Sequence, residues 1–395
     1  MGVWLIGAKG GVASTATVGL IALKERLIPP VGLVSELPQF QPLGLIDWGN
    51  FVVAGHEIRA VPLIHETRRL ATESHTTTVE VIETCRPALE QIEGRIRPGT
   101  TYQVGPAIAA LADADLPRNE TPRQIVDRLG RDMREFARRE QLAHVVVVNV
   151  ASTEPPVDAA RLPPTWPELE QTLDIGGPCP LPASSLYAVA ALDAGYSYIN
   201  FTPSLGAAPP AIQHLAVLRG TRHCGCDGKT GETLLKSVLA PMFARRNLRV
   251  MSWVGHNIFG NMDGQVLDDP ANKRAKVASK DHLLGEILGY RPKTLVSIEF
   301  VPDLGDWKTA WDHIHFAGFL GAPMTLQFTW QGCDSVLAAP LVLDLVRFTE
   351  LAWRRGEVGP MNHLASFFKS PYGAAEHSFD RQFQALEQWA ANGQG

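Results

Sequence analysis

The sequence predicts an α/β protein in which helices and strands alternate around a doubly wound sheet, followed by a second, smaller sheet. Three observations support this prediction. Continuous apolar runs, which are typical of strands buried on both faces, occur at residues 2–6 and 144–150. Helical patterns separate such runs as far as about residue 243. From residue 248 several runs alternate polar and apolar residues, as in TLQFTW (325–330), which predicts an open, partly antiparallel sheet.

Length and composition indicate a globular chain with two domains. The 395 residues exceed what one hydrophobic core usually serves. A formal net charge of −5 and the lack of a Lys/Arg-rich run argue against a nucleic-acid partner, and no apolar stretch is long enough to span a bilayer. The first residues enter an apolar run without a basic leader, so we expect no signal peptide. Five cysteines, an odd number, argue against a disulfide framework and for a reducing cytoplasm.

The first predicted strand leads into a glycine-rich turn, GAKGGVAST (7–15), and then into a helical pattern. This geometry presents backbone N–H groups and a positive helix end to a pyrophosphate, although the glycine spacing is not G-x-G-x-x-G and a purely structural turn is the alternative. A second apolar run at residues 31–34 predicts the next strand. The acid that often holds an adenosine ribose after that strand could be Glu36 or Glu57.

The remaining elements follow from apolar periodicity and from helix caps. Strands are expected at residues 144–150, 196–201, 214–219, 249–254, 295–301, 314–320 and 324–330. Helices are expected at residues 79–92, 122–139, 184–192, 234–243, 336–353 and 374–389, the second of them capped by Thr121.

Polar turns follow several of the predicted strands, at the sheet edge where α/β proteins bind ligands. Two of them lie at residues 151–155 and 200–204. A third, DGKTGET (227–233), opens a helix and resembles a small phosphate-binding loop with Gly231, two hydroxyls, a lysine and a helix amino end, although it is not a Walker A sequence. Residues 257–264 are a further predicted turn, dense in amides and carboxylate after a strand.

Four lysines stand in such polar turns. Lys276 and Lys280 have i,i+4 spacing, Lys308 ends the turn 302–308, and Lys369 follows two phenylalanines. Any one of them alone would be interpreted as a surface lysine. Together with two helix amino ends suited to phosphate, they favour redox chemistry at a dinucleotide combined with stabilisation of oxyanions by fixed cations.

These blocks, in this order, resemble the myo-inositol-1-phosphate synthase family, and its bacterial branch more than its eukaryotic one. The resemblance is densest at residues 7–15, 150–154, 200–204, 227–233, 257–280, 304–308, 333–340 and 367–371. It implies a Rossmann-like NAD-binding domain formed by residues 1–235 and 340–395. It also implies an inserted α+β domain, residues 236–339, that serves catalysis and pairs across subunits into a homotetramer.

The function implied by the resemblance is the NAD-dependent isomerising cyclisation of D-glucose 6-phosphate to 1D-myo-inositol 3-phosphate. Carbon 5 is oxidised, carbon 6 enolises and attacks the carbon 1 aldehyde, and the cyclic ketone is reduced by the same cofactor. Three alternatives stay open at this point: a net NAD-dependent sugar-phosphate dehydrogenase, a cyclase acting on a related hexose phosphate, and a non-catalytic NAD-binding protein.

The resemblance also assigns roles to residues of this chain. Lys276 and Lys369 would flank the carbon 5 oxygen, Lys308 would stabilise the carbon 1 oxyanion, and Lys280 would bind the phosphate and take part in catalysis. The cofactor would be bound by Gly7, Gly10, Gly11, Val12, Ala13, Glu57, Ala151, Ser152, Thr153, Thr202, Asp227, Asp263, Asp306, Asp334 and Ser335. The substrate phosphate would be bound by Thr230, Gly231, Thr233, Asn261 and Lys280.

The chain also departs from the family pattern at two positions in these blocks. Met262 stands where many relatives have a second Asn, and Glu232 stands where they have Gln, which places a negative charge near the expected phosphate site. A metal requirement stays open. Asp263 together with phosphate oxygens could hold a magnesium-type ion, and a divalent or monovalent cation is the expected form of any such cofactor.

Overall fold

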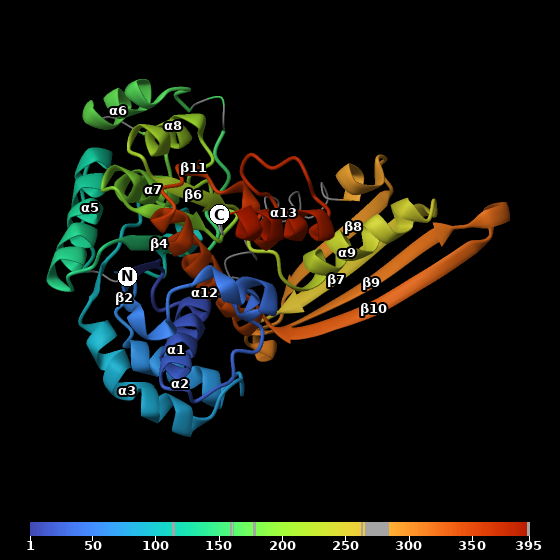
Figure 1. The fold of residues 1–395 in the computed structure, drawn as a ribbon, viewed down its shortest axis with the longest axis horizontal. Coiled ribbons are helices and arrows are strands. Elements are labelled where there is room, and N and C mark those ends of the chain that lie inside the picture. The colour runs from blue at the N-terminus through green and yellow to red at the C-terminus, as the bar shows by residue number, and fades with distance from the viewer. Residues whose placement is uncertain are drawn as a thin grey trace.

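The computed structural model describes residues 1–112, 115–158, 160, 162–176, 179–261, 264 and 284–392. It consists of a body built on a seven-stranded sheet and an elongated four-stranded sheet that projects from that body (Figure 1). Among the described residues, no helix combines the length and the apolar character needed to cross a bilayer.

The seven-stranded sheet has the order β11-β6-β5-β4-β1-β2-β3, and every neighbouring pair in it is parallel. Its strands are β1 (Gly2–Ile6), β2 (Val52–Glu57), β3 (Ile96–Pro98), β4 (Val145–Asn149), β5 (Ser197–Asn200), β6 (Arg222–Gly225) and β11 (Gly359–Pro360). The chain leaves β1 for β2 on one side and β4 on the other. The carboxyl ends of β1 and β4 therefore form the switch point at which doubly wound sheets bind ligands.

Helices cover both faces of this sheet, which confirms the predicted doubly wound fold (Figure 1). One face is covered by α1 (Gly11–Lys24), α2 (Leu63–Thr72), α3 (Val79–Glu93), α12 (Asp334–Arg354) and α13 (Phe379–Asn392). The other is covered by α5 (Pro122–Arg139), α6 (Trp166–Asp174), α7 (Ala183–Asp193) and α8 (Pro210–Leu218), and the short α4 (Pro106–Ala109) lies in a loop before α5. Because β4 is buried on both faces, its run of valines needs no polar alternation.

Helix α5 shows how directly a capped, amphipathic sequence specifies its own structure. Thr121 caps the helix, and the side chain of Gln124 reaches back to the Thr121 backbone N–H. The predicted apolar stripe, which includes Leu129, Met133 and Phe136, is buried against the sheet. Both ends of the helix agree with the prediction.

The second sheet has the order β10-β9-β7-β8. Its strands are β7 (Arg249–Phe259), β8 (Lys293–Phe300), β9 (Trp307–Ala317) and β10 (Pro323–Cys333). Strand β9 is antiparallel to β7 and β10, and β8 is parallel to β7, so the predicted partly antiparallel sheet is confirmed. Helix α9 (Gly231–Arg245) covers one face, where Phe243 packs with Trp253 and Ile314.

Several predicted elements are wrong or differ in extent. Residues 31–34 form no strand, because they follow two prolines and Val31 is 84 % exposed; the second strand is β2. Residues 214–219 lie in and just after α8, where Leu215 and Ala216 are buried while Val217 and Leu218 are exposed, so the spacing is helical.

The expected polar turn at residues 257–264 begins too early. Strand β7 continues to Phe259, and the Asn257 side chain is fully buried within it. Strand β9 ends at Ala317, and Phe319 and Leu320 form an exposed hairpin tip instead of extending the strand. The remainder of the lysine-bearing stretch, including Lys276 and Lys280, lies outside the described residues.

Candidate functional site

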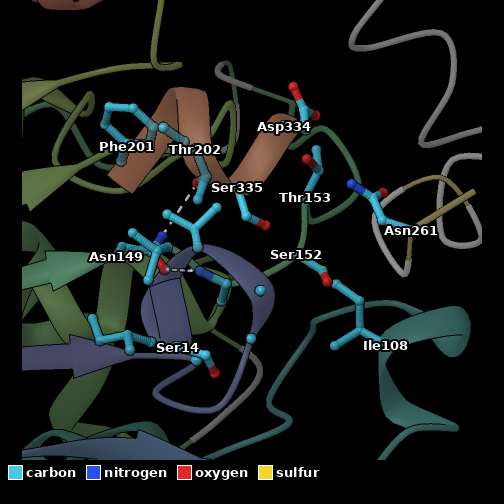
Figure 2. Close-up of a pocket in the computed structure, with 18 of the residues that line it drawn as sticks. Ser14, Ile108, Asn149, Ser152, Thr153, Phe201, Thr202, Asn261, Asp334 and Ser335 are labelled. Atoms are coloured by element: carbon cyan, nitrogen blue, oxygen red, sulfur yellow. Dashed lines mark hydrogen bonds between the residues drawn. The ribbon is translucent and has the colours of Figure 1, made fainter. Parts of the chain in front are cut away.

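A cavity of about 460 Å³ opens at the carboxyl edge of the parallel sheet. Its walls come from the loops after β1, β2, β4, β5 and β6, from the amino end of α12, and from the turns that bound the second sheet. Figure 2 shows Ser152, Thr153, Asn261, Asp334 and Ser335 around this space, although the segments that carry them are far apart in the sequence.

Most of the site residues expected from the sequence line this one cavity. Those that do are Gly7, Gly10, Gly11, Val12, Glu57, Ala151, Ser152, Thr153, Thr202, Asp227, Thr230, Asn261, Asp306, Lys308, Asp334, Ser335 and Lys369. Ala13, Gly231 and Thr233 are buried in the first turns of α1 and α9 and do not line it. Asp263, Lys276 and Lys280 lie outside the described residues.

The glycine-rich turn is shaped so that other backbone approaches it closely. Gly7 has φ +78°, and a Cβ there would lie 2.9 Å from the Cα of Ala151. A Cβ on Gly11 would lie 2.6 Å from the Ser335 Oγ. Within the described chain no side chain caps α1, so its first N–H groups are left to face the cavity. An uncapped helix amino end of this kind suits a pyrophosphate.

Glu57 is the acid that the second strand delivers to the cavity. Its Oε2 accepts a hydrogen bond from the Lys9 N–H at 2.8 Å, and its Oε1 accepts from the N–H groups of Ile58 and Arg59 at 2.8 and 3.2 Å. These bonds fix the carboxylate at the end of β2, where a ribose-binding acid is expected.

Glu36, the other candidate, is part of the scaffold and does not line the cavity. Its carboxylate lies 2.5 Å from the Arg347 guanidinium of α12 and accepts from the Trp48 indole at 2.9 Å. Although partial burial opposes this, the bonds from Arg347 and Trp48 lower the pKa of Glu36 below its ordinary value. Of the two acids, Glu57 is therefore the one that lines the cavity.

Arg59 stands beside Glu57, but its guanidinium is already engaged. Its Nη2 donates to the Lys9 carbonyl at 2.6 Å, its Nη1 lies 3.3 Å from a Glu66 oxygen, and its Nε lies 3.5 Å from Glu57. Two carboxylates, Glu57 and Glu66, thus surround the arginine next to Glu57 that could attract an extra phosphate on the ribose.

A buried amide network sets the loop after β4. The Asn149 Nδ2 donates to the Asn200 Oδ1 and to the Thr202 Oγ1, both at 3.2 Å, and the Asn149 Oδ1 accepts from the Ala151 N–H at 3.3 Å (Figure 2). The predicted cofactor-lining residues 151–153 and Thr202 are positioned by these bonds.

Glu154 lines the cavity as well, and the sequence analysis missed it. Its carboxylate accepts from both the N–H and the hydroxyl of Ser184 at the start of α7, and burial raises the pKa of Glu154 to about 7 in spite of these bonds. The sequence feature that could have identified Glu154 as a site residue is its position directly after Thr153, in the polar turn that follows β4.

Asp306 joins three segments at the mouth of the second sheet. Its Oδ1 accepts from the Asn261 amide at 2.9 Å, and its Oδ2 accepts from the Ser335 N–H at 3.1 Å and from the Cys333 thiol at 2.9 Å. Lys308 follows two residues later, with its Nζ 3.8 Å from an Asp334 oxygen and 5.1 Å from the centre of the Phe259 ring.

The loop after β6 pairs with the segment that carries Lys369. Residues 225–229 and 367–372 form a short antiparallel ribbon, in which Gly228 bridges Phe368 and the Lys369 N–H donates to the Asp227 carbonyl at 2.7 Å. The Lys369 Nζ lies 2.7 Å from the Asp227 Oδ1, and its side chain is 10 % exposed. Lys369 is therefore held in an ion pair at the cavity wall and does not extend into bulk solvent.

Lys229, which the sequence analysis included in a phosphate-binding loop, points away from the cavity. Its side chain is buried, and its Nζ donates to the Gln382 Oε1 of α13 at 2.5 Å and lies 6.0 Å from the Phe379 ring. Burial, assisted by the charge of Lys369, lowers the pKa of Lys229 to about 7. The local sequence carried no sign of this contact, because its partner lies 153 residues further along the chain.

Glu232 does not direct its charge at the first turn of α9. Its Oε1 lies 2.5 Å from the Lys236 Nζ, and both side chains are almost fully buried. A Cβ on Gly255 would lie 2.8 Å from the same Glu232 oxygen, so the carboxylate faces β7. The charge that Glu232 introduces, where many relatives have Gln, is thus neutralised by Lys236 one turn later in α9.

Within the described part of the chain, no three His, Cys, Asp or Glu side chains are grouped so that they could hold a metal ion. Asp263, the residue considered for such an ion, is not among the described residues. A divalent or monovalent cation therefore stays an expectation from the sequence.

Comparison with known proteins identifies relatives along the whole chain. The family model described as Myo-inositol-1-phosphate synthase matches residues 1–391. Inositol-3-phosphate synthase 1 of Bacteroides thetaiotaomicron is 30% identical over 404 residues, which span 95% of this chain and 90% of that protein. The human inositol-3-phosphate synthase 1 is 28% identical, over 90% of this chain and 68% of its own length.

Solved structures show the same fold. A myo-inositol-1-phosphate synthase-related protein from Thermotoga maritima superposes with a TM-score of 0.80 at 25% identity, covering 99% of this chain and 98% of its own. The inositol-3-phosphate synthase of Caenorhabditis elegans superposes with a TM-score of 0.88 at 24% identity, covering 98% and 84%.

Replacement of Lys229 should change how stability depends on pH. Between pH 7 and 10.5 the unfolded chain binds a proton at Lys229 that the folded protein has released, so this lysine makes wild-type stability rise with pH across that window. Lys229→Met should reduce the slope of the unfolding free energy against pH by up to the equivalent of about one bound proton. Urea unfolding at pH 7, 8 and 9 measures it, with the exposed Lys24→Met as the control. Equal slopes in wild type and Lys229→Met would contradict the burial argument.

Proposed function

The chain belongs to the myo-inositol-1-phosphate synthase family, and we propose that it converts D-glucose 6-phosphate into 1D-myo-inositol 3-phosphate with NAD as its cofactor. The family expected from the sequence is therefore confirmed. The observation that carries the proposal is the single cavity in which a glycine-rich pyrophosphate cradle, Glu57, Lys308 and the Asp227–Lys369 pair meet.

The residues present fit NAD. Gly7 and Gly11 let the Ala151 backbone and the Ser335 hydroxyl approach the turn closely, and the uncapped amino end of α1 suits a pyrophosphate. Glu57 suits the hydroxyl groups of an adenosine ribose. When bound, NAD takes the hydride from carbon 5 of the sugar and returns it to the cyclic ketone, so the net reaction is an isomerisation.

The lysines of the cavity would manage the charge on oxygen. Oxidation of carbon 5 releases a proton from its hydroxyl, and Lys369, oriented by Asp227, would hold that oxygen and exchange its proton. The ketone makes the carbon 6 proton acidic, and the resulting enolate attacks the carbon 1 aldehyde. Lys308 would stabilise the oxyanion formed at carbon 1. Lys276 and Lys280 would complete this set, by the family resemblance alone.

We also propose the division into a domain of residues 1–235 and 340–395 and an inserted domain of residues 236–339. This is supported by the two sheets, since β1–β6 and β11 form one and β7–β10, all within residues 249–333, form the other. The described cysteines, Cys85, Cys179, Cys224, Cys226 and Cys333, are free thiols, which supports a cytoplasmic location that cell fractionation can test.

A homotetramer built on the projecting sheet is the oligomer we propose. The face of this sheet opposite α9 carries Leu295 and Trp311, 54 % and 45 % exposed, and two such faces could cover each other. Trp311→Glu should therefore produce a smaller species in analytical ultracentrifugation, with Thr325→Glu at the sheet edge as the comparison. A wild type that sediments as a monomer would refute this arrangement.

The function is tested with purified protein, glucose 6-phosphate and a catalytic amount of NAD, with the product identified by phosphorus and carbon NMR. Conversion to an inositol phosphate without accumulation of NADH is expected. Sustained formation of NADH would favour a net dehydrogenase, and turnover only on another hexose phosphate would favour a related cyclase. No turnover on any hexose phosphate would favour a binding protein.

NAD should bind at least about 10-fold more tightly than NADP, because the Glu57 carboxylate repels a 2′-phosphate and Arg59 is engaged by Glu57 and Glu66. Calorimetry with both dinucleotides measures the ratio. Glu57→Gln should reduce the ratio of NAD affinity to NADP affinity, whereas Glu36→Gln should leave this ratio unchanged in the folded protein. Tighter binding of NADP by wild type would refute the assignment.

Lys369→Ala should reduce turnover by about 10²-fold or more, the usual scale for losing a positioned acid–base group. Folding and NAD binding should be nearly unchanged, because the backbone ribbon that carries Lys369 does not depend on its side chain. Lys369→Arg should not rescue activity, since guanidinium stays charged and has a different geometry. The exposed Lys293→Ala is the control. Retention of more than about a tenth of wild-type turnover, well outside that scale, would remove Lys369 from the mechanism.

A further inference from the structure

The amino end of α9 is the expected site of the substrate phosphate, and among the described residues no side chain caps it. Thr230 precedes the helix without capping it by its side chain, and Gly231 has φ +50°. The first backbone bond recorded within this turn is from Leu234 to the Thr230 carbonyl at 3.4 Å. Glu232, the acid of this turn, is paired with Lys236. The turn thus keeps its positive end for a ligand.

Trp330 approaches this turn from the second sheet. It lies on β10 opposite Ala310, and strand alternation puts it on the same face as Leu326 and Phe328, which pack in the core under α9. A Cβ built on Gly231 would lie 3.4 Å from the Trp330 Nε1. The indole nitrogen therefore lies beside the position where the helix begins.

The Trp330 indole N–H is buried and has no acceptor among the described residues. An indole nitrogen can only donate, and a buried donor without an acceptor is destabilising. Other tryptophans of the chain meet this requirement. Trp4 donates to His56, Trp48 to Glu36, Trp253 to Asp312, Trp307 to the Ser74 carbonyl and Trp389 to Glu357.

We propose that the Trp330 indole N–H donates a hydrogen bond to the substrate phosphate at the amino end of α9. The inference rests on the proposed function, which places a phosphate ester there. A phosphate bound by the N–H groups of the first turn presents further oxygens, and one of them can face the indole that lies beside Gly231. Trp330 then links the phosphate to the sheet that carries Lys308, because Lys308 lies opposite Gly332 in the same strand pair.

The test replaces Trp330 by Phe, which keeps an aromatic ring on Gly231 and removes only the donor. KM for glucose 6-phosphate should rise by about 10-fold or more, the scale of losing a hydrogen bond to a charged group, while kcat changes by less than about threefold. The inhibition constant of inorganic phosphate should rise by the same factor, and NAD affinity should not change. Trp389→Phe, which removes a half-buried indole donor away from the cavity, is the matched control and should leave both constants unchanged.

A purely structural role for Trp330 predicts a different result. Trp330→Phe would then lower the melting temperature and leave the KM for glucose 6-phosphate and the phosphate inhibition constant within about twofold of wild type, which would overturn the inference. If wild type shows no turnover, the proposed function fails by itself. Calorimetric binding of inorganic phosphate to wild type and Trp330→Phe then decides the role of Trp330, and equal or absent binding overturns it.

A measurement on wild-type protein does not depend on how the variant folds. Addition of inorganic phosphate to protein labelled with ¹⁵N at the indole nitrogens should shift one indole N–H resonance, which Trp330→Tyr removes from the spectrum. A spectrum in which phosphate shifts none of the indole resonances would also refute the proposal.

Discussion

The antiparallel pairing of residues 225–229 with residues 367–372 is the contact on which the site depends. It brings the segment after the inserted sheet back to the loop after β6, and it sets Lys369 opposite Asp227. Because the backbone makes this contact, the ammonium is positioned without a long flexible approach from solvent, and little side-chain entropy remains to be lost when a substrate binds.

Three lysines with largely buried side chains are each paired with a carboxylate. Lys369 is paired with Asp227, Lys236 with Glu232 and Lys9 with Glu93, at distances of 2.5–2.7 Å. Lys229 instead meets the neutral amide of Gln382, and its pKa is correspondingly the one that falls to about 7. A carboxylate partner offsets the desolvation of a charge, whereas an amide offsets only part of it.

Local sequence predicted the elements that are stabilised locally. Strands β1 and β4 and helix α5 follow from apolar runs, an N-cap and a stripe of buried residues. The prediction of a strand at residues 31–34 was wrong, because a short apolar run next to prolines carries no information about strand pairing. Most expected site residues meet because parallel strands end at one edge. The orientations of Lys229, Glu232 and Trp330 could not be predicted, since each is set by packing against an element distant in sequence.

The chain passes from the seven-stranded sheet to the four-stranded sheet and then back, and this order has a consequence for folding during synthesis on the ribosome. The glycine-rich turn, Glu57 and the loop after β4 are translated first, whereas Asp306, Ser335 and Lys369 follow the inserted sheet. A nascent chain could therefore form the glycine-rich turn early, but Lys369 would reach the cavity only after residues 225–229 pair with residues 367–372. Contacts between segments far apart in the sequence form slowly, so the incomplete seven-stranded sheet would remain exposed to premature association with other chains. Early cofactor binding would stabilise the part of this sheet that has already folded.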